Sequence, residues 1–293
     1  MNLVVGATGN LGGTICRRLL GRGDPVRALL RQSSDYRGLE AAGAKIAFGD
    51  LKDPASLEEA CGGTDRLIAT ATAAARGGAD TIESVDRAGY ASLIRAAEAA
   101  NVGQFIFVSA HGFTPDSSLS LARAKAATEE ALRTSSLDET ILKPSLFMEA
   151  WFGLVLGMQV KAGSQVRVVG DPDKPYGFVA TENVADLAIA VLEHPQAQRA
   201  EIPLSAAAVS FRQIIEWIEE AIGRSIEIEA IEPGQEVRGL PPIVSELWAW
   251  AASGQVEGIE TPDVADKFGI ELVTPRQFIE AAFSTPEQAA TAP

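Results

Sequence analysis

The sequence predicts an α/β protein built on a doubly wound parallel sheet, with a smaller α+β cap formed by the C-terminal part of the chain. Apolar strand-like segments alternate with helical patterns through the first half, which is typical of a parallel sheet with helical crossovers. The segment 104–109 is almost wholly apolar, as expected of a strand that helices cover on both faces. A glycine-rich turn joins the first strand to the first helix.

Composition and charge limit the function classes. A chain of 293 residues with 46% apolar composition can bury a large core, and its net charge of −14 argues against a general nucleic-acid or anionic-membrane partner. Cys16 and Cys61 lie outside any CxxC pattern, which excludes a disulfide framework and a cysteine metal site, and Cys16 is expected in the core. There is no signal-peptide pattern and no apolar run of roughly 18 residues. We expect a soluble cytoplasmic protein, and a homodimer is compatible with the sequence.

The opening turn predicts a dinucleotide site. Strand residues Leu3–Val5 run into Gly6, Gly9 and Gly12, and a helical pattern with Leu11, Ile15 and Leu19 on one face follows. Glycines allow a positive φ and a close approach of the backbone to a ligand, while the N–H groups of a new helix attract an anion such as a pyrophosphate. The spacing departs from the usual G-x-G-x-x-G. The alternative is that these glycines serve only a tight turn and close helix packing.

The end of the second strand indicates which dinucleotide is preferred. Strand 26–30 ends at Arg31, with Ser33 and Ser34 beside it and no carboxylate before Asp35. A carboxylate at this position commonly holds the ribose 2′-hydroxyl of NAD, whereas an arginine accommodates the 2′-phosphate of NADP. We therefore expect NADP(H) to be preferred over NAD(H). The alternative is that Arg31 is a solvated charge at a strand end.

The following elements complete the predicted sheet. The helix at 79–100 carries Ile82, Val85, Gly89 and Leu93 at spacings of three and four, which is typical of a helix lying on a sheet. The predicted elements, in order, are a strand at 44–48, a helix at 54–60, a strand at 66–71, the helix at 79–100, a strand at 104–109, a helix at 119–134 and a strand at 140–144.

The pattern is less regular beyond residue 144. Segment 145–162 predicts a very apolar helix, 175–180 a short strand, and Thr181 an N-cap. Ser210 with Gln213, and Thr274 with Gln277, predict capped helices, and a short helix is expected between Thr261 and Gly269. We expect residues 1–150 to form the dinucleotide-binding domain with 171–198 returning to it, 151–170 and 199–283 to form a smaller substrate-binding subdomain, and 284–293 to be a loose tail.

These segments together resemble one known group. The shared stretches are Val5–Gly12, Leu30–Arg31, Gly49–Leu51, Phe107–Ser109, Leu121–Lys125 with Glu129, Ile141–Pro144 with Phe147–Met148, and Glu182–Asp186. In these stretches the chain resembles the NmrA-like branch of the atypical short-chain dehydrogenases/reductases. That group includes reductases of quinones, dyes and phenylpropanoids, and also proteins that bind the cofactor as redox-sensing regulators.

The resemblance implies a Rossmann domain that binds NADP(H). It implies contacts from the opening turn, from Arg31 to the 2′-phosphate, and from Lys125 to the nicotinamide ribose. The full predicted cofactor set is Gly6, Thr8, Gly9, Asn10, Leu11, Arg31, Asp50 and Leu51 at the adenine, Thr70 and Ala71 beneath the cofactor, Ser109, Lys125 and Pro144.

One departure from ordinary short-chain dehydrogenases affects the chemistry. Those enzymes use Tyr-x-x-x-Lys, in which the lysine lowers the pKa of the phenol. Leu121 stands in the tyrosine position before Lys125, and Tyr36, Tyr90 and Tyr176 have no lysine four residues later. Alcohol oxidation of the usual kind is therefore not expected. Hydride transfer to a quinone, imine, azo bond or activated alkene needs little beyond holding the nicotinamide against the acceptor.

Two residues are candidates for catalysis. The Lys125 ammonium can stabilise developing negative charge or donate a proton, and burial would lower its pKa toward the working range. The alternative is that Lys125 only positions the ribose and pairs with Glu129 one turn on. His111 follows the strand at 104–109 at the ligand-binding edge of the sheet, where it can act as a general acid or be an ordinary loop residue. His194 is expected at the surface, and the two histidines and two cysteines do not build a usual zinc site.

The predicted substrate site adds an apolar wall to His111. Its members, Phe147, Met148, Trp151 and Phe152, follow the last strand of the sheet, although each taken alone is more readily a core residue than a contact. The leading hypothesis is an NADPH-dependent reductase of a small, hydrophobic, conjugated acceptor that is quinone-like, an azo or imine compound, or an enone. The competing hypothesis is a non-catalytic NADP(H)-sensing regulatory protein. A biosynthetic role with other oxidative chemistry also stays open.

Overall fold

The computed structural model describes residues 1–283 apart from 75, 164, 236, 238 and 257. The chain divides into two compact units: unit 1 comprises Met1–Lys143 and Val184–Ile202, and unit 2 comprises Pro144–Asn183 and the chain from Pro203 onward. The loose tail predicted at 284–293 lies outside the described residues.

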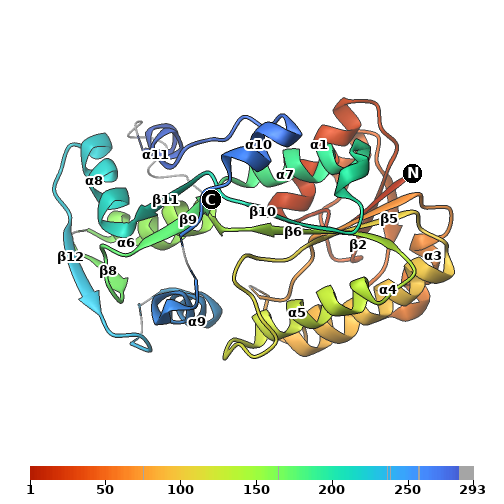
Figure 1. Ribbon diagram of the computed structural model, residues 1–293, viewed down its shortest axis with the longest axis horizontal. Helices are drawn as coiled ribbons and strands as arrows, with labels where there is room; N and C mark the ends of the chain where they lie inside the picture. The colour runs from red at the N-terminus through yellow and green to blue at the C-terminus, as the bar shows by residue number, and fades with distance from the viewer. Residues whose placement is uncertain (75, 164, 236, 238, 257, 284–293) are drawn as a thin grey trace. The chain divides into compact units, whose positions relative to one another are not determined.

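Unit 1 is built on a seven-stranded sheet with the order β10-β6-β5-β4-β1-β2-β3 (Figure 1). Each neighbouring pair from β3 to β6 is parallel, and the order reverses between β1 and β4. The strands are β1 (Asn2–Val5), β2 (Val26–Leu30), β3 (Lys45–Phe48), β4 (Arg66–Ala69), β5 (Gln104–Val108), β6 (Asp138–Pro144) and β10 (Ala200–Leu204). The predicted doubly wound α/β fold is confirmed, and its reversal point is where open parallel sheets bind ligands.

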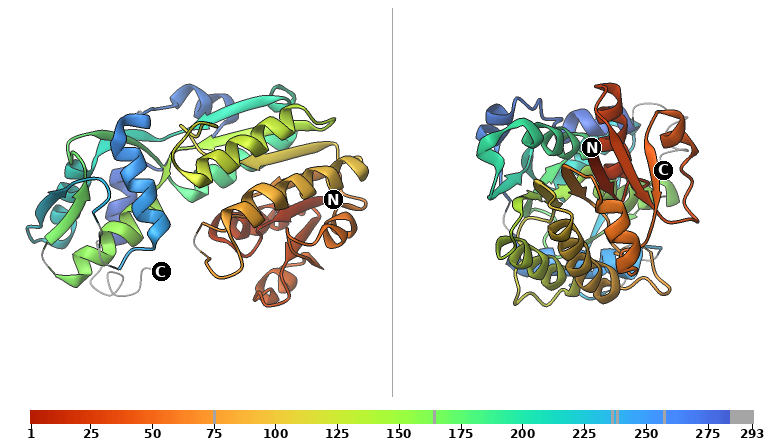
Figure 2. Two further views of the ribbon diagram at one scale, coloured as in Figure 1. Left: turned by 90° about the horizontal axis from the view of Figure 1, so that it is seen from below. Right: turned by 90° about the vertical axis from the view of Figure 1, so that its right-hand side faces the viewer.

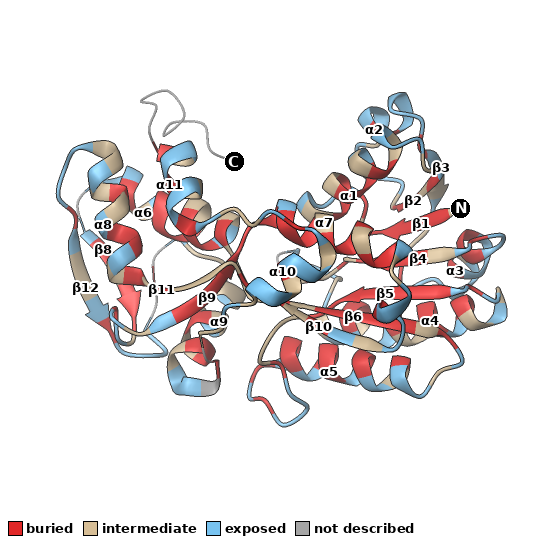
Figure 3. Cartoon of the chain, turned by 45° about the horizontal axis from the view of Figure 1, so that its top comes forward, coloured by how far each residue is buried: buried red, intermediate tan, exposed pale blue. Residues whose placement is uncertain are grey.

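Helices cover both faces of this sheet. Figures 1 and 2 show α1 and α7 on one face and α3, α4 and α5 on the other. The helical segments are α1 (Asn10–Gly21), α2 (Arg37–Ala41), α3 (Pro54–Cys61), η1 (Ile82–Gly89), α4 (Tyr90–Ala99), α5 (Ser120–Arg133), α7 (Thr181–Ala190), η3 (Val191–Glu193) and η4 (Pro195–Ala197). Because both faces are covered, β1 and β5 are buried along their whole length (Figure 3).

The helix predicted at 79–100 begins later than expected. Its first turns, η1, start at Ile82, because Thr81 caps them: Thr81 Oγ1 accepts a hydrogen bond from Ser84 N at 3.0 Å. Ser84 Oγ in turn accepts one from Thr81 N at 3.0 Å, which completes a capping box that the predicted helix bounds do not include. Residues Ala79 and Asp80 consequently belong to the loop that follows β4.

Unit 2 contains both helices and small sheets, as predicted for the C-terminal α+β part. One sheet has the order β11-β9-β7 and the other pairs β12 with β8. The elements are β7 (Leu146–Phe147), η2 (Glu149–Leu156), α6 (Gly157–Ala162), β8 (Gln165–Val169), β9 (Pro175–Val179), β11 (Ala207–Ser210), α8 (Phe211–Ile222), β12 (Glu227–Ile231), α9 (Pro242–Trp250), η5 (Ala251–Gln255), α10 (Pro262–Phe268) and α11 (Pro275–Phe283).

Two expectations about this region need correction. Segment 145–162 is not one helix, because Leu146 and Phe147 form β7 and pair in parallel with Phe178 and Val179 of β9. The segment expected to return to the first domain starts at Val184 rather than at residue 171, since β9 pairs with β7 and β11 inside unit 2.

Candidate functional site

The glycine turn after β1 packs tightly against the end of β4. Gly6 has a φ of +89°, and a Cβ there would lie 2.7 Å from Thr70 Oγ1 and 2.8 Å from the backbone nitrogen of Ala71. A Cβ on Gly12 would lie 2.3 Å from the carbonyl oxygen of Gly6. Only glycine fits either position. Packing thus accounts for Gly6 and Gly12, and it places Thr70 and Ala71 directly against the turn.

The outer side of the same turn is open to a ligand. Thr8, Gly9 and Asn10 are exposed, and Gly9 is the N-cap of the twelve-residue helix α1. The first turn of α1 carries no acidic side chain, so nothing there opposes the positive end of the helix dipole. Leu11, also predicted to contact the cofactor, is half-buried in that first turn. The turn therefore has the backbone geometry and the electrostatics that bind a pyrophosphate.

A pocket lies beside the turn, within unit 1. It brings together Gly6, Thr8, Arg31, Asp50, Leu51 and Ala71, all of which belong to the cofactor set that the sequence predicts. Val5, Leu29 and Val85 add apolar walls, which suit a flat aromatic ring such as adenine. Gly49 also lines the pocket, and a Cβ there would lie 2.9 Å from Leu29 Cδ1. The residues present fit the adenosine part of a dinucleotide.

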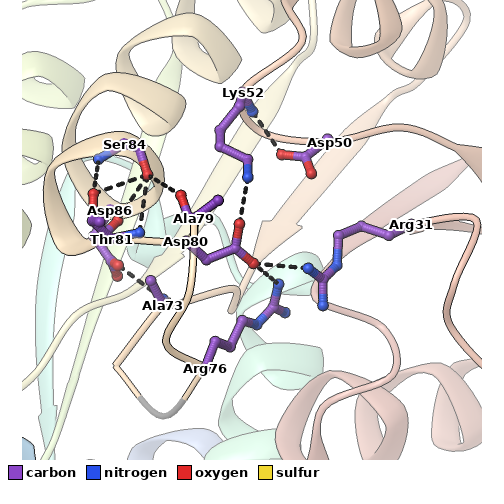
Figure 4. A network of polar contacts seen from close by, with 10 residues as sticks. All are labelled: Arg31, Asp50, Lys52, Ala73, Arg76, Ala79, Asp80, Thr81, Ser84 and Asp86. Atoms are coloured by element: carbon purple, nitrogen blue, oxygen red, sulfur yellow. Dashed lines mark hydrogen bonds and ion pairs between the residues drawn. The ribbon is translucent and has the colours of Figure 1, made fainter.

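Three cations, of which two line this pocket, surround one carboxylate (Figure 4). Arg31 Nη1 lies 2.7 Å from Asp80 Oδ2, Arg76 Nη1 lies 3.7 Å from the same oxygen, and Lys52 Nζ donates to Asp80 Oδ1. The hydrogen bond from Lys52 lowers the pKa of Asp80, and the same bond raises the pKa of Lys52. Arg31 is therefore an ion-paired side chain in this structure. Arg31 and Arg76 also line the pocket.

Lys52, Arg76 and Asp80 are not among the site residues that the sequence motifs indicate. Lys52 follows Gly49–Leu51 and Arg76 lies in the loop after β4, so both come after the carboxyl ends of sheet strands, as Arg31 does. That shared position is a signal that could have identified the two cations. Asp80 lies in the same loop as Arg76, but nothing in the sequence indicates that its carboxylate meets Arg31, which is 49 residues away.

Lys125 is held inside unit 1 at the end of β5. Its side chain is 8% exposed, and Nζ donates to the carbonyl oxygen of Val108 at 2.7 Å and lies 4.9 Å from the centre of the Phe107 ring. Burial lowers the pKa of Lys125, and the negative charges of Asp86 and Glu129 oppose that shift. Because its pKa is lowered, this buried lysine at the end of β5 gives up its proton more readily than an exposed lysine does.

Glu129 has other partners than the expected lysine. Its carboxylate accepts hydrogen bonds from Arg133 Nη2 at 3.1 Å and from Ser109 Oγ, and it forms an ion pair with Lys143 Nζ at 3.0 Å. The hydroxyl of Ser109 is therefore engaged inside unit 1, where Ser109 is buried. His111 lies two residues further on, half-buried, in the loop that leads to α5.

The predicted apolar wall is mostly core. Met148, Trp151 and Phe152 are 0%, 5% and 0% exposed. The Phe152 ring centre lies 4.8 Å from that of Phe178, and the Trp151 ring centre lies 5.4 Å from that of Trp248, all within unit 2. Phe147 alone of the four is half-buried, and Pro144, the last residue of β6, is buried. The structure thus favours the core interpretation for Met148, Trp151 and Phe152.

Among the described residues, no group of histidine, cysteine and acidic side chains has an arrangement that could hold a metal ion. Within the same part of the chain, none of the helices combines the length and the apolar character that crossing a bilayer requires.

Three relatives match along most of the chain. An NAD(P)H azoreductase of Xenophilus azovorans is 27% identical, over 88% of this chain and 90% of its own length. The photosystem II assembly factor Ycf39 of Synechocystis is 30% identical, over 78% of this chain and 70% of its own length. An NmrA-like family domain-containing oxidoreductase of Aspergillus flavus is 24% identical, over 94% of this chain and 93% of its own length.

A solved structure supports the fold. The NADPH complex of the quinone oxidoreductase QOR2 from Escherichia coli superposes with a TM-score of 0.80 at 20% identity, covering 97% of this chain and all of that one. The NAD(P)H-binding family matches residues 6–195, a range that contains the glycine turn, the pocket residues other than Val5, and Lys125. The chain thus belongs to the NAD(P)H-binding family and resembles its NmrA-like members, as the sequence motifs predict.

Proposed function

We propose that the protein is an NADPH-dependent reductase that passes a hydride to a small, hydrophobic, conjugated acceptor such as a quinone, an azo or imine compound, or an enone. The observation that carries this proposal is the pocket joining the glycine turn to Arg31 and Arg76, in a chain similar over 88% of its length to an NAD(P)H azoreductase. The similarity to QOR2 supports the fold on which such chemistry is carried out.

The residues of unit 1 would hold the cofactor as follows. The backbone of Gly6–Leu11 and the start of α1 bind the pyrophosphate, and Leu29, Leu51 and Val85 contact the adenine. Arg31, Lys52 and Arg76 bind the 2′-phosphate, which gives the preference for NADP(H) over NAD(H). When bound, the cofactor supplies the hydride.

The chain's own contribution to the chemistry comes from Lys125. Its ammonium stabilises negative charge on the reduced acceptor or donates the proton, and His111 is the second candidate for the donor. Leu121, in the position of the usual tyrosine, is buried one turn before Lys125 and offers no phenol. Of the four residues in the predicted apolar wall, Phe147 is the one that is only half-buried, so in this proposal it is the one that remains accessible to a substrate.

A cytoplasmic location and a homodimer stay predictions.

Replacing Arg31 by alanine is expected to weaken NADPH binding about tenfold and to leave NADH binding almost unchanged, because a charge-assisted contact to the 2′-phosphate is lost. Isothermal titration calorimetry with both cofactors measures the two dissociation constants. Arg37→Ala is the matched control, since this arginine lies nearby in the sequence with 89% of its side chain exposed. Equal affinity of the parent protein for NADPH and NADH would contradict the proposed preference.

A panel of quinones, azo dyes and enones tests the reaction. We expect at least one of them to accelerate the loss of NADPH absorbance in the presence of the protein, and NADH to be the poorer donor. The protein is incubated with each acceptor at a saturating cofactor concentration, and buffer alone gives the background rate.

The similarity to the assembly factor Ycf39 favours a second candidate function, in which NADP(H) occupancy controls a protein partner without turnover. The two functions make different predictions for the same panel. Tight NADPH binding together with no turnover of any acceptor would support this regulatory function against the reductase.

A further inference from the structure

We propose that Asp80 is an internal anion in the 2′-phosphate subsite, which competes with the phosphate of NADP(H) and has to leave when that cofactor binds. Asp80 thereby limits the preference for NADP(H) over NAD(H). This inference rests on the proposed role of Arg31, Lys52 and Arg76 in binding the 2′-phosphate.

The contacts of Asp80 are those that a phosphate would make. Both carboxylate oxygens are in use: Oδ1 accepts from Lys52, and Oδ2 pairs with Arg31 at 2.7 Å and with Arg76 at 3.7 Å (Figure 4). The cations come from the loops that follow β2, β3 and β4. Phosphate oxygens accept from the same donors and carry more negative charge. The carboxylate thus holds the three cations together in the arrangement that a phosphate needs.

The exposed fractions of the four side chains show that the cations, rather than the carboxylate, face solvent. The side chain of Asp80 is 9% exposed, whereas those of Arg31, Lys52 and Arg76 are 40%, 33% and 34% exposed. The cations therefore enclose the carboxylate while parts of their own surfaces stay accessible. Two of the three, Arg31 and Arg76, also line the pocket. A 2′-phosphate that reached these cations would meet a carboxylate bound to the same nitrogens. The phosphate and the carboxylate would then be close neighbours. Because like charges that lie close together repel, holding both anions in the subsite costs electrostatic free energy.

The loop that carries Asp80 has the means to move it. Gly77 and Gly78 have φ angles of +75° and +69°, and a Cβ on either would meet nothing within 4 Å. On the other side of Asp80, Thr81 is fixed by its capping box with Ser84. The carboxylate therefore lies between a glycine pair with free space around it and an anchored helix start. Gly77 and Asp80 form an isolated antiparallel bridge, and Ser84 Oγ donates to the carbonyl oxygen of Ala79 at 3.5 Å. Rotation about the glycines releases Asp80 once these two contacts open, while the Thr81–Ser84 capping box keeps the start of η1 in place.

The same carboxylate suits NAD(H) when it stays in place. An acidic side chain near the end of the second strand commonly accepts the ribose 2′-hydroxyl of NAD. Asp80 meets Arg31 at that strand end, although it comes from a different loop. With Asp80 in place the subsite favours the hydroxyl, and with Asp80 released it favours the phosphate.

The test is Asp80→Asn, which keeps the size of the side chain and removes its charge. Isothermal titration calorimetry gives the dissociation constants for NADPH, NADH and the fragment 2′,5′-ADP. We expect Asp80→Asn to bind NADPH and 2′,5′-ADP about fivefold more tightly than the parent, because a competing charge is lost, and to bind NADH no more tightly. Asp80→Ala is expected to change the three constants in the same direction.

The matched control is Glu59→Gln, which removes an exposed carboxylate of α3 outside this network. It is expected to leave all three constants unchanged, and the thermal unfolding of each variant shows that it is folded. Unchanged or weaker binding of NADPH by both Asp80 variants would overturn the inference, because Asp80 would then only organise the cations. Equal binding of NADPH and NADH by the parent would instead overturn the proposed cofactor preference.

Discussion

Replacing Gly12 by alanine is expected to weaken NADPH binding by a factor of about 100 or more and to lower the free energy of unfolding by about 1 to 3 kcal/mol. The added Cβ would lie 2.3 Å from the carbonyl oxygen of Gly6, 2.8 Å from its carbonyl carbon and 2.9 Å from Thr70 Oγ1. Two of these neighbours are backbone atoms of the turn itself. Gly6 has no room to retreat, because it already packs against Thr70 and Ala71. The turn therefore has to change shape.

The control for this experiment lies in the same helix. Gly21 ends α1, and a Cβ there would meet nothing within 4 Å. Gly21→Ala is expected to bind NADPH as the parent does and to unfold at the same temperature or higher. Calorimetric titration and thermal unfolding measure both quantities. A Gly12→Ala protein with parental affinity would show that the turn does not hold the cofactor.

Replacing Lys125 by methionine is expected to lower kcat by a factor of about 100 or more while the dissociation constant for NADPH changes little. Methionine keeps most of the volume of this buried side chain and removes the ammonium. If Lys125 serves only to position the ribose, the opposite result follows: NADPH binding weakens and kcat is almost unchanged. Steady-state kinetics together with calorimetry on the same protein separate the two roles, and Lys45→Met, which changes an exposed lysine of β3, is the control.

The pH dependence gives a second readout of the same residue. Burial lowers the pKa of Lys125, so that its proton is lost at a lower pH than from an ordinary lysine. If the ammonium is the proton donor, kcat falls as the pH rises through that lowered pKa. Lys125→Met is expected to lose this alkaline fall, and a parent whose kcat is unchanged across the alkaline range would contradict the assigned role.

The sequence is most informative where local chemistry determines structure. Strand 26–30 was predicted with the bounds that the structure shows, and Ser210 caps α8 by accepting from Gln213 N at 3.2 Å, as expected. The start at Ile82 was missed, because the Thr81–Ser84 box lacks the usual Glu or Gln partner. Segment 145–162 was misjudged because β7 is two residues long and its pairing with β9 is not local.

In the candidate site, too, the sequence reveals local features but not contacts between distant residues. The turn and Arg31 could be found from spacing, because each lies at a strand end that the hydrophobic pattern marks. The ion pair between Arg31 and Asp80 could not, because it joins positions that only the fold brings together. Met148 and Phe152 show that an apolar run does not distinguish a pocket wall from a core, since both kinds of site select large apolar side chains.

The most direct test of the proposed reductase is a single-turnover reaction with NADPH carrying deuterium at the transferred position. The protein is preloaded with either NADPH or its deuterated form and mixed with the best acceptor of the panel, and the decay of cofactor absorbance is followed. We expect decay far faster than without protein, slowed by deuterium because the C–H bond that supplies the hydride breaks in the measured step, and slowed again in Lys125→Met. Tight binding of NADPH with decay no faster than in buffer would contradict it.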